Sequence, residues 1–335
     1  MRAVLKYPRF TAGLALLLLM GLVATTGCKK RAEAPPPPPP TPTPVIPPGS
    51  LVFIQKGHLA RLDMESNQIT PLTSGKSTEW YPSCSPKGDQ VIYWSNYAEG
   101  NSGQGSYNLW KMNLDGTNRI QLTFEETDAI QTNEQNLRLN DAASWSIDGK
   151  RIIYSIGGDI WTINSDGYNP ETILLGHHAL CPLLSPDGKT VLFISNEGDV
   201  VFNIWALNLE EKTVKKITEY TDWNVGSPSY SMDGKKILFN LYRSNVTQVY
   251  TANADGSDPL NITNNNRSLC PRYAVNDRKI VFSSFGTGED AGLNLFIVNA
   301  NGTETKTLTT EGGASPSWAP ARVVTSTSLP TPVGK

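Results

Sequence analysis

Hydrophobic and polar positions along this chain form one pattern that recurs about every forty residues. In each unit, a turn rich in Ser, Pro, Asp and Gly precedes a short apolar run: QVIYWS (90–95), RIIYSI (151–156), TVLFIS (190–195), KILFNL (236–241) or KIVFSS (279–284). A second run follows: NLWKMN (108–113), DIWTIN (159–164), NIWALN (203–208), QVYTAN (248–253) or NLFIVN (294–299). Runs of this length and composition are typical of β-strands.

Each unit also bends at two fixed places. The first bend reads SPDGK at 185–189, with variants at 85–89, 146–150, 231–235 and 274–278. The second bend carries Asp-Gly or Asn-Gly, at 115–116, 166–167, 255–256 and 301–302. Because Gly accepts the positive φ of a type I′ turn, these dipeptides predict tight hairpins. A short strand before the first bend and a closing run that often ends in Leu-Thr or Ile-Thr complete four strands per unit.

The two ends of the pattern are incomplete in complementary ways. Residues 50–73 supply a second, third and fourth strand without a first, whereas residues 313–320 supply only a first strand. Joined, they make a sixth unit, which implies a ring closed by its termini. Four-stranded units of this length in a ring describe a β-propeller. We therefore predict an all-β, six-bladed propeller closed by N-terminal strands (about 50–73) and a C-terminal strand (about 313–320).

The repeated motif resembles that of a known family. Pro-x-Trp/Tyr-Ser-Pro-Asp-Gly-Lys, an apolar strand, Asp-Gly and Leu-Thr are similar to the propeller repeat of the TolB family, and the resemblance covers residues 50–320. It implies a propeller fold, and it implies a place in the bacterial envelope, because TolB is a periplasmic component of an envelope system. TolB has a separate α/β domain before its propeller, whereas this sequence has a proline-rich segment there.

The N-terminal residues have the layout of an export signal. Positive residues precede an apolar run from Phe10 to Ala24, and small residues lead to Cys28. The segment 24–28 resembles the lipobox of bacterial lipoproteins, which implies that Cys28 is lipidated and anchors the protein to a membrane. By the same resemblance, Lys29 implies an outer-membrane lipoprotein that faces the periplasm or the cell surface. An ordinary secreted protein is the alternative.

These features divide the chain into four parts. We expect a signal peptide at 1–27, the lipidated Cys and a proline-rich tether at 28–49, the propeller at 50–322 and a disordered tail at 323–335. The proline-rich run favours extended polyproline II and suits a spacer. A proline-rich ligand for a partner's groove is the alternative interpretation.

Charge and cysteine content narrow the functional classes. The net charge is −2 and no basic stripe is present, so nucleic acid is not an expected partner. Besides Cys28 there are three cysteines, Cys84, Cys181 and Cys270, and an odd number does not make a disulfide framework. Cys181 and Cys270 each precede a proline at the same place in the repeat. We expect both to be buried apolar residues, with a bridge between them as the alternative.

The sequence contains few candidate metal-binding or catalytic residues. His177, His178 and Cys181 lie close together, and imidazole and thiolate suit zinc. Adjacent residues on a strand point to opposite sides, so at most one His would join Cys181. We expect the histidines to line the channel mouth, with a metal site as the alternative, and we expect no cofactor. No Gly-x-Ser-x-Gly elbow is present, and the sequence predicts a non-enzymatic protein.

The TolB resemblance implies that segments joining one blade to the next face the channel entrance. Their aromatic and polar residues are Trp80, Tyr81, Asp141, His177, His178, Trp223, Asn224, Arg267 and Glu311, beside Glu79 and Arg138. Aromatic residues and Arg are favoured at protein-binding hot spots. We therefore predict that a monomeric propeller binds an envelope protein or peptide there. The alternative is a carbohydrate-binding or carbohydrate-cleaving envelope protein that uses Trp80 and Trp223 as sugar platforms.

Overall fold

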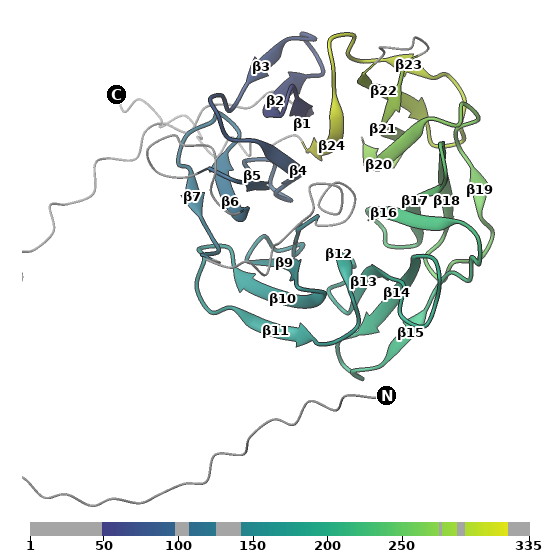
Figure 1. Ribbon diagram of the computed structural model, residues 1–335. Helices are drawn as coiled ribbons and strands as arrows, with labels where there is room; N and C mark the ends of the chain where they lie inside the picture. The colour runs from purple at the N-terminus through teal and green to yellow at the C-terminus, as the bar shows by residue number, and fades with distance from the viewer. Residues whose placement is uncertain (1–48, 98–106, 125–141, 275–276, 287–291, 321–335) are drawn as a thin grey trace, which may run out of the picture. The chain divides into compact units, whose positions relative to one another are not determined.

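The computed structural model describes residues 49–97, 107–124, 142–274, 277–286 and 292–320. All of them belong to the second of two units of the chain, Met1–Thr43 and Pro44–Lys335. They form six four-stranded antiparallel sheets arranged as blades around an axis (Figure 1). The predicted six-bladed propeller is confirmed. Within the described ranges, no helix has the length and apolar character needed to cross a membrane.

The blades are named A to F, and their strands are given from the axis outward. Blade A contains β24 (Ala314–Ala319), β1 (Ser50–Gln55), β2 (His58–Asp63) and β3 (Ile69–Pro71). Blade B contains β4 (Glu79–Cys84), β5 (Gln90–Ser95), β6 (Asn108–Asn113) and β7 (Ile120–Gln121). Blade C contains β8 (Ser144–Trp145), β9 (Arg151–Ile156), β10 (Asp159–Asn164) and β11 (Glu171–Leu174). Blade D contains β12 (Leu180–Leu184), β13 (Thr190–Ser195), β14 (Asn203–Asn208) and β15 (Val214–Lys216). Blade E contains β16 (Asn224–Tyr230), β17 (Lys236–Arg243), β18 (Val246–Asn253) and β19 (Leu260–Asn261). Blade F contains β20 (Ser268–Ala274), β21 (Lys279–Phe285), β22 (Leu293–Asn299) and β23 (Lys306–Thr307).

Blade A closes the ring, as the sequence predicts. The C-terminal strand β24 pairs with the N-terminal strand β1, and Leu51 lies opposite Trp318. The junction to blade B is also bonded, because the Cys84 amide donates to Ser317 Oγ at 2.9 Å. Residues far apart in the sequence therefore share one blade.

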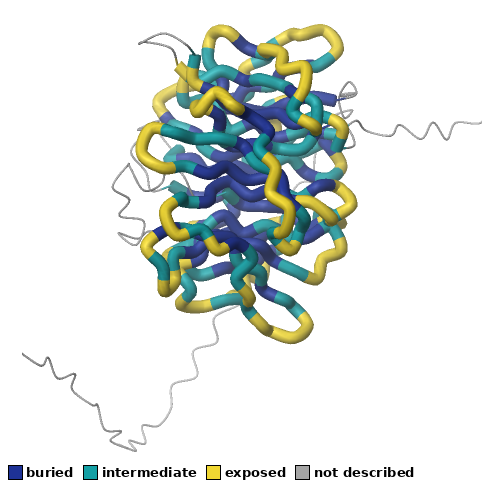
Figure 2. Tube along the Cα trace, turned by 90° about the vertical axis from the view of Figure 1, so that its right-hand side faces the viewer, coloured by how far each residue is buried: buried dark blue, intermediate teal, exposed yellow. Residues whose placement is uncertain are grey.

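The second strand of each blade is buried on both faces because the neighbouring blades sandwich it. The fourth position of that strand is aromatic in all six blades and at most 4% exposed: Phe53, Tyr93, Tyr154, Phe193, Phe239 and Phe282. Figure 2 shows these buried segments running through the interior, with exposed segments at the turns and connections. Burial on both faces explains why the runs are continuously apolar rather than alternating.

The Leu-Thr and Ile-Thr pairs that close most units have a defined structural role. In five blades a Thr hydroxyl accepts a backbone N–H from the first half of the third strand at 2.9 Å: Thr73, Thr123, Thr218, Thr263 and Thr309. Each bond satisfies a buried backbone donor. The Thr side chain thereby fixes the start of the connection to the next blade.

Alternating strand directions give the ring two faces. We call one the hairpin face, because it carries the Ser-Pro-Asp-Gly turns and the Asp-Gly turns. The other is the connector face, which carries the inter-blade connectors and the loops between second and third strands. Backbone hydrogen bonds join a connector, or the strand that follows it, to a loop of the preceding blade, for example from Ala179 N to Gly158 O at 2.7 Å and from Val225 N in β16 to Phe202 O at 2.9 Å. Because β1 begins and β24 ends on the hairpin face, residues 49 and 320 both lie there.

The inner strands share a bulge that the sequence pattern did not predict. In five of them a residue with φ between 48° and 51° precedes a proline: Tyr81, Cys181, Ser227, Cys270 and Ser315. The pairing register shifts at each of these places. A proline lacks an N–H, and an inner strand has no further strand on its axial side, so the proline leaves no ladder donor missing. The bulge changes the direction of the side chains that follow it.

Candidate binding face

The residues predicted for the channel mouth lie on the connector face or at its edge, where the structure describes them. Trp80 and Tyr81 belong to β4, and Asn224 begins β16. His177, His178, Trp223, Arg267 and Glu311 lie in connectors. Asp141, Arg138 and the expected lipidation site Cys28 lie outside the described residues.

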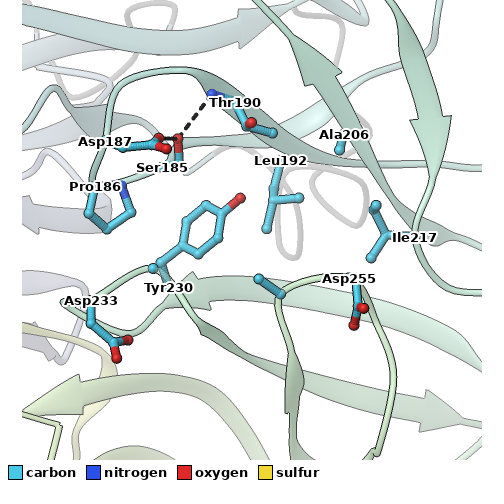
Figure 3. A pocket seen from close by; sticks show the side chains of 12 residues that line it. Ser185, Pro186, Asp187, Thr190, Leu192, Ala206, Ile217, Tyr230, Asp233 and Asp255 are labelled. Atoms are coloured by element: carbon cyan, nitrogen blue, oxygen red, sulfur yellow. Dashed lines mark hydrogen bonds between the residues drawn. The ribbon is translucent and has the colours of Figure 1, made fainter.

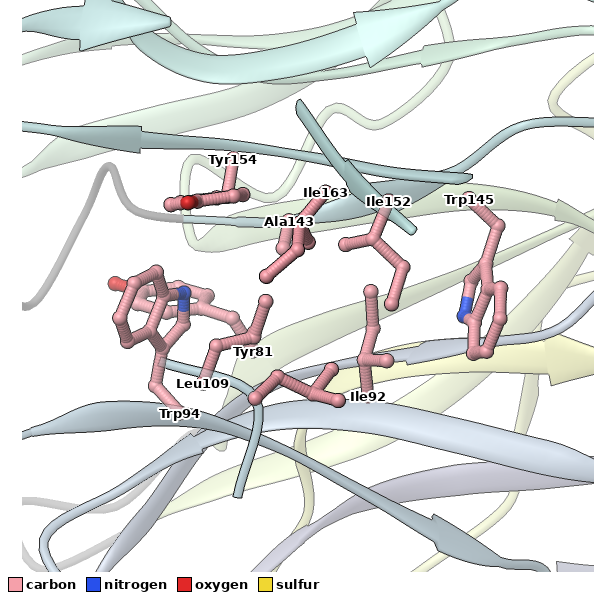
Figure 4. Packing of buried hydrophobic residues seen from close by; sticks show 10 residues of the cluster. Tyr81, Ile92, Trp94, Leu109, Ala143, Trp145, Ile152, Tyr154 and Ile163 are labelled. Atoms are coloured by element: carbon pink, nitrogen blue, oxygen red, sulfur yellow. The ribbon is translucent and has the colours of Figure 1, made fainter. Parts of the chain in front are cut away.

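The two aromatic residues of β4 contribute to the interior. Tyr81 is 7% exposed and belongs to the apolar cluster between blades B and C. Figure 4 shows it beside Trp94 at one end of that cluster, with Trp145 at the other end. Trp80 is half-buried, packs against the same cluster, and donates its Nε1–H to the Tyr107 hydroxyl at 3.3 Å.

The connector into blade D presents a mixed polar and apolar surface. His177 Nδ1 lies 2.5 Å from Glu197 Oε2, and this pair joins the connector to the loop between β13 and β14. The His177 carbonyl also accepts the Ser195 hydroxyl at 2.6 Å, which fixes the backbone. His178 beside it is exposed. Leu175 and Val200 flank the pair and are 65% and 94% exposed.

Further around the ring, hydrogen bonds hold each connector in place. Asn224 Oδ1 accepts the Phe202 amide at 2.9 Å, which attaches the blade D loop to blade E. Trp223 is half-buried against the cluster of blades D and E. Arg267 is exposed and donates from Nη1 to the Gly286 carbonyl at 2.5 Å. Glu311 is exposed, and its carbonyl accepts Gln55 Nε2 at 3.4 Å.

Sequence analysis missed the most exposed apolar residues of this face. Phe124, Leu175 and Val200 lie in connectors or loops, and Phe285 ends β21, and all four are exposed. Val200 and Val201 follow the polar segment Asn-Glu-Gly-Asp, and the sequence does not tell which of the two is exposed, whereas the structure exposes Val200 and buries Val201. Apolar residues at turn positions are nevertheless the signal that would have found them.

Potential metal and thiol chemistry is limited. Among the residues that the structure describes, no three His, Cys, Asp or Glu side chains gather as a metal site. Cys181 and Cys270 are 4% and 8% exposed, so their predicted burial is confirmed. Burial raises the pKa of the Cys84 thiol to about 12, although hydrogen bonding to Ser317 acts in the opposite direction. Cys84 is therefore a poor nucleophile at neutral pH.

A cavity of about 390 Å³ lies between blades D and E on the hairpin face (Figure 3). Its apolar lining includes Leu192 and Ile217, and Figure 3 shows the Tyr230 ring directed toward the middle of the pocket. Asp187 at its edge accepts the Ser185 hydroxyl at 2.5 Å and the Lys189 amide at 3.1 Å. These bonds, the hydroxyl first, lower the pKa of Asp187. The carboxylate is thus already bonded within its own turn.

A known protein family has the same repeat. The family model described as TolB beta propeller domain matches residues 144–326, more than half of the chain. The chain belongs to the TolB beta propeller family.

Individual relatives support the membership over shorter segments. A stretch of 172 residues is 28% identical to an uncharacterized protein of Agrobacterium fabrum and covers 48% of this chain and 58% of the relative. A stretch of 140 residues is 30% identical to the Tol-Pal system protein TolB of Francisella tularensis subsp. tularensis and covers 41% of this chain and 31% of the relative. The matches therefore span less than two thirds of either relative.

Solved structures share the fold. TolB from Acinetobacter baumannii aligns with a TM-score of 0.63 and 20% identity over 81% of this chain and 66% of that chain. A putative TolB from Agrobacterium tumefaciens aligns with a TM-score of 0.59 and 20% identity over 78% of this chain and 88% of that chain. At this identity the TolB likeness concerns the propeller architecture.

Proposed function

We propose that this TolB-family propeller is an envelope protein that binds a protein or peptide through its connector face. The exposed apolar side chains of that face carry the proposal. Val200 is 94% exposed, and Phe124, Leu175 and Phe285 are also exposed on the same side of the ring. The hairpin face also has exposed apolar residues, for example Ile147 and Met232, but the connector face combines its four with hydrogen-bonded loops and exposed polar groups, which favours protein contacts.

The surroundings of these side chains suit recognition. His178 and Arg267 add exposed polar groups, and Arg is frequent at hot spots. The connectors are tied to neighbouring loops through the Asn224–Phe202 and Ser195–His177 hydrogen bonds. Such bonds hold the loops in one arrangement, so binding loses less conformational entropy.

Family membership adds a cellular context to the proposal. The relative in Francisella is named as the TolB protein of a Tol-Pal system. We place this chain in the bacterial envelope as a monomeric outer-membrane lipoprotein anchored through Cys28. Residue 49, where the described part of the propeller begins, lies on the hairpin face. Trp80 and Trp223 pack against inter-blade clusters, which argues against their use as flat sugar platforms.

The test is photo-crosslinking in intact cells with a Leu175→Glu/Val200→Glu double variant. Both side chains are exposed, so the fold should tolerate the change, while a charged residue in an apolar contact should reduce capture of one discrete envelope protein at least tenfold. Ile147→Glu is the matched control, because Ile147 is an exposed apolar residue on the hairpin face. Equal capture by wild type and double variant, or binding to a glycan array with no captured protein, would overturn the proposal.

A further inference from the structure

Among the described inner strands, one charged side chain lies on the axial side of the ring. Across the six inner strands, only Glu79 and Arg272 carry charge. Glu79 is enclosed by its partners at the start of β4, whereas Arg272 lies in the second half of β20. The residues at the corresponding position of the other inner strands are uncharged: Ser83, Ser144, Leu183, Ser229 and Ser317.

The guanidinium of Arg272 reaches toward the neighbouring inner strands. Its Nη1 donates to the Pro271 carbonyl at 2.8 Å and to the Ser227 carbonyl of β16 at 3.4 Å. Burial lowers the pKa of Arg272, and the nearby thiols of Cys270 and Cys181 act in the opposite direction. Contact with β16 and proximity to Cys181 on β12 place the side chain on the axial side of the ring.

Arg272 has no counterion among the described residues. None of their ion pairs includes it, and both of its hydrogen bonds come from Nη1 and go to carbonyl oxygens. The N–H groups of Arg272 Nε and Nη2 therefore have no hydrogen-bond partner among the described residues. The side chain is half-buried, so solvent still reaches it. Arg stays protonated in proteins, so the guanidinium remains a cation here. Partial removal of an unpaired cation from water costs free energy, which an anionic partner would offset.

Polar groups from three blades surround the base of this side chain. The Ser227 hydroxyl lies 3.6 Å from Cys270 Sγ, and the Ser315 hydroxyl lies 3.9 Å from the same sulfur. All three residues have φ near 50° and precede a proline, so the shared bulge brings them together. Ser227 also offers its carbonyl to Arg272, so the guanidinium reaches the inner strand of blade E.

We propose that Arg272 binds a carboxylate that enters along the axis of the propeller. The guanidinium presents its remaining donors in the planar fork that matches a carboxylate. A singly charged anion neutralises the one cation, whereas a dianion would keep an uncompensated charge among buried groups. The carboxylate belongs either to a peptide or to a small organic acid. This site is separate from the connector-face contacts and does not depend on them.

The test is a ¹⁹F NMR titration of trifluoroacetate with the purified full-length protein in a carboxylate-free buffer. We expect protein-dependent broadening of the trifluoroacetate line that acetate reverses. Arg272→Gln removes the cation and should reduce the broadening at least fivefold, and Arg272→Lys should keep only part of it. Arg278→Gln is the matched control, since Arg278 is an exposed cation in the turn between β20 and β21 on the hairpin face. Broadening that survives in Arg272→Gln, or that is lost in Arg278→Gln, would mean adventitious surface binding and would overturn the site.

Two further measurements complete the experiment. Circular dichroism and urea unfolding establish whether each variant is folded. If Arg272→Gln does not fold, Arg272→Lys is compared with wild type instead. Competition with acetyl-Gly-Gly as the free acid and as the C-terminal amide distinguishes the source of the carboxylate. Displacement by the acid alone assigns the site to peptide carboxylates, and displacement by acetate but neither peptide assigns it to small acids. Displacement by the amide as strongly as by the acid would show that no carboxylate is recognised.

Discussion

At the scale of single residues, Glu79 is the most heavily bonded side chain of the propeller. Its carboxylate is fully buried and receives five side-chain groups: His58 Nδ1 (2.9 Å), Thr73 Oγ1 (2.8 Å), Ser77 Oγ (2.7 Å), Ser95 Oγ (3.2 Å) and Arg119 Nη2 (3.3 Å). Arg119 is enclosed in turn by the rings of Tyr93, Tyr97 and Trp110. Because His58 and Thr73 come from blade A, the network joins blade A to blade B.

Replacing Glu79 by Gln tests this network. The substitution keeps the shape but removes the charge that compensates Arg119, and breaking a buried pair costs about 3–5 kcal/mol. Urea unfolding should show that loss. The control is Glu171→Gln, which removes a largely exposed partner of Arg151 at 2.8 Å and should cost at most about 1 kcal/mol. Equal losses in the two variants would contradict a special role for Glu79.

At the scale of elements, the Ser-Pro-Asp-Gly turn is a small hydrogen-bonded unit that recurs. The Asp accepts the Ser hydroxyl and the amide two residues ahead, for instance at 2.6 Å and 3.0 Å in Asp148. The Ser hydroxyl in turn accepts the amide that begins the second strand, at 2.9 Å for both Arg151 and Thr190. These bonds lower the pKa of Asp148, Asp187 and Asp233; the hydroxyl is the largest cause in the first two and the Lys235 amide in the third.

This direction of the shift predicts how stability depends on pH. A carboxyl whose pKa is lower in the folded state than its unfolded value of about 3.9 contributes fully above that value. Its contribution is lost as the pH falls through the folded pKa. The unfolding free energy of wild type should therefore exceed that of Asp187→Asn most clearly above pH 5, and the difference should shrink below about pH 4. Urea unfolding at a series of pH values measures it, and a difference that is constant down to pH 2.5 would contradict the account.

Strands and turns of this protein could be predicted from sequence because the signals that specify them are local. The runs at 90–95, 151–156 and 190–195 coincide with β5, β9 and β13. The connector positions of His177, Trp223 and Arg267 also followed from the repeat. The bulge before each inner-strand proline could not be predicted, since it depends on how strands curve around an axis. The burial of Tyr81, the exposure of Val200 and the axial position of Arg272 depend on that curvature and on packing between blades.

At the scale of the whole molecule, closure of the ring decides whether any blade edge is exposed. Strand β24 pairs with β1 and packs against β4 and β20, so one C-terminal strand contacts three blades. Without it, β1 would present unpaired backbone groups beside Val52 and Phe53, which are fully buried in the closed ring. Such an edge favours association with other chains. We therefore expect the stability of the ring to depend on the pairing of its two ends.

Truncation at the C-terminus tests whether the stability of the blades depends on ring closure. A chain that ends at residue 313 lacks β24, whereas a matched chain that ends at residue 320 keeps all of it. We expect the shorter chain to lose its cooperative urea transition or to aggregate, because blade A loses its inner strand and the neighbouring blades lose the contacts that β24 makes. The longer chain should unfold in one transition, measured by tryptophan fluorescence and by light scattering. A cooperative transition at the same urea midpoint in both chains would show that the blades are stable without closure, as in a linear array whose units contact only their neighbours.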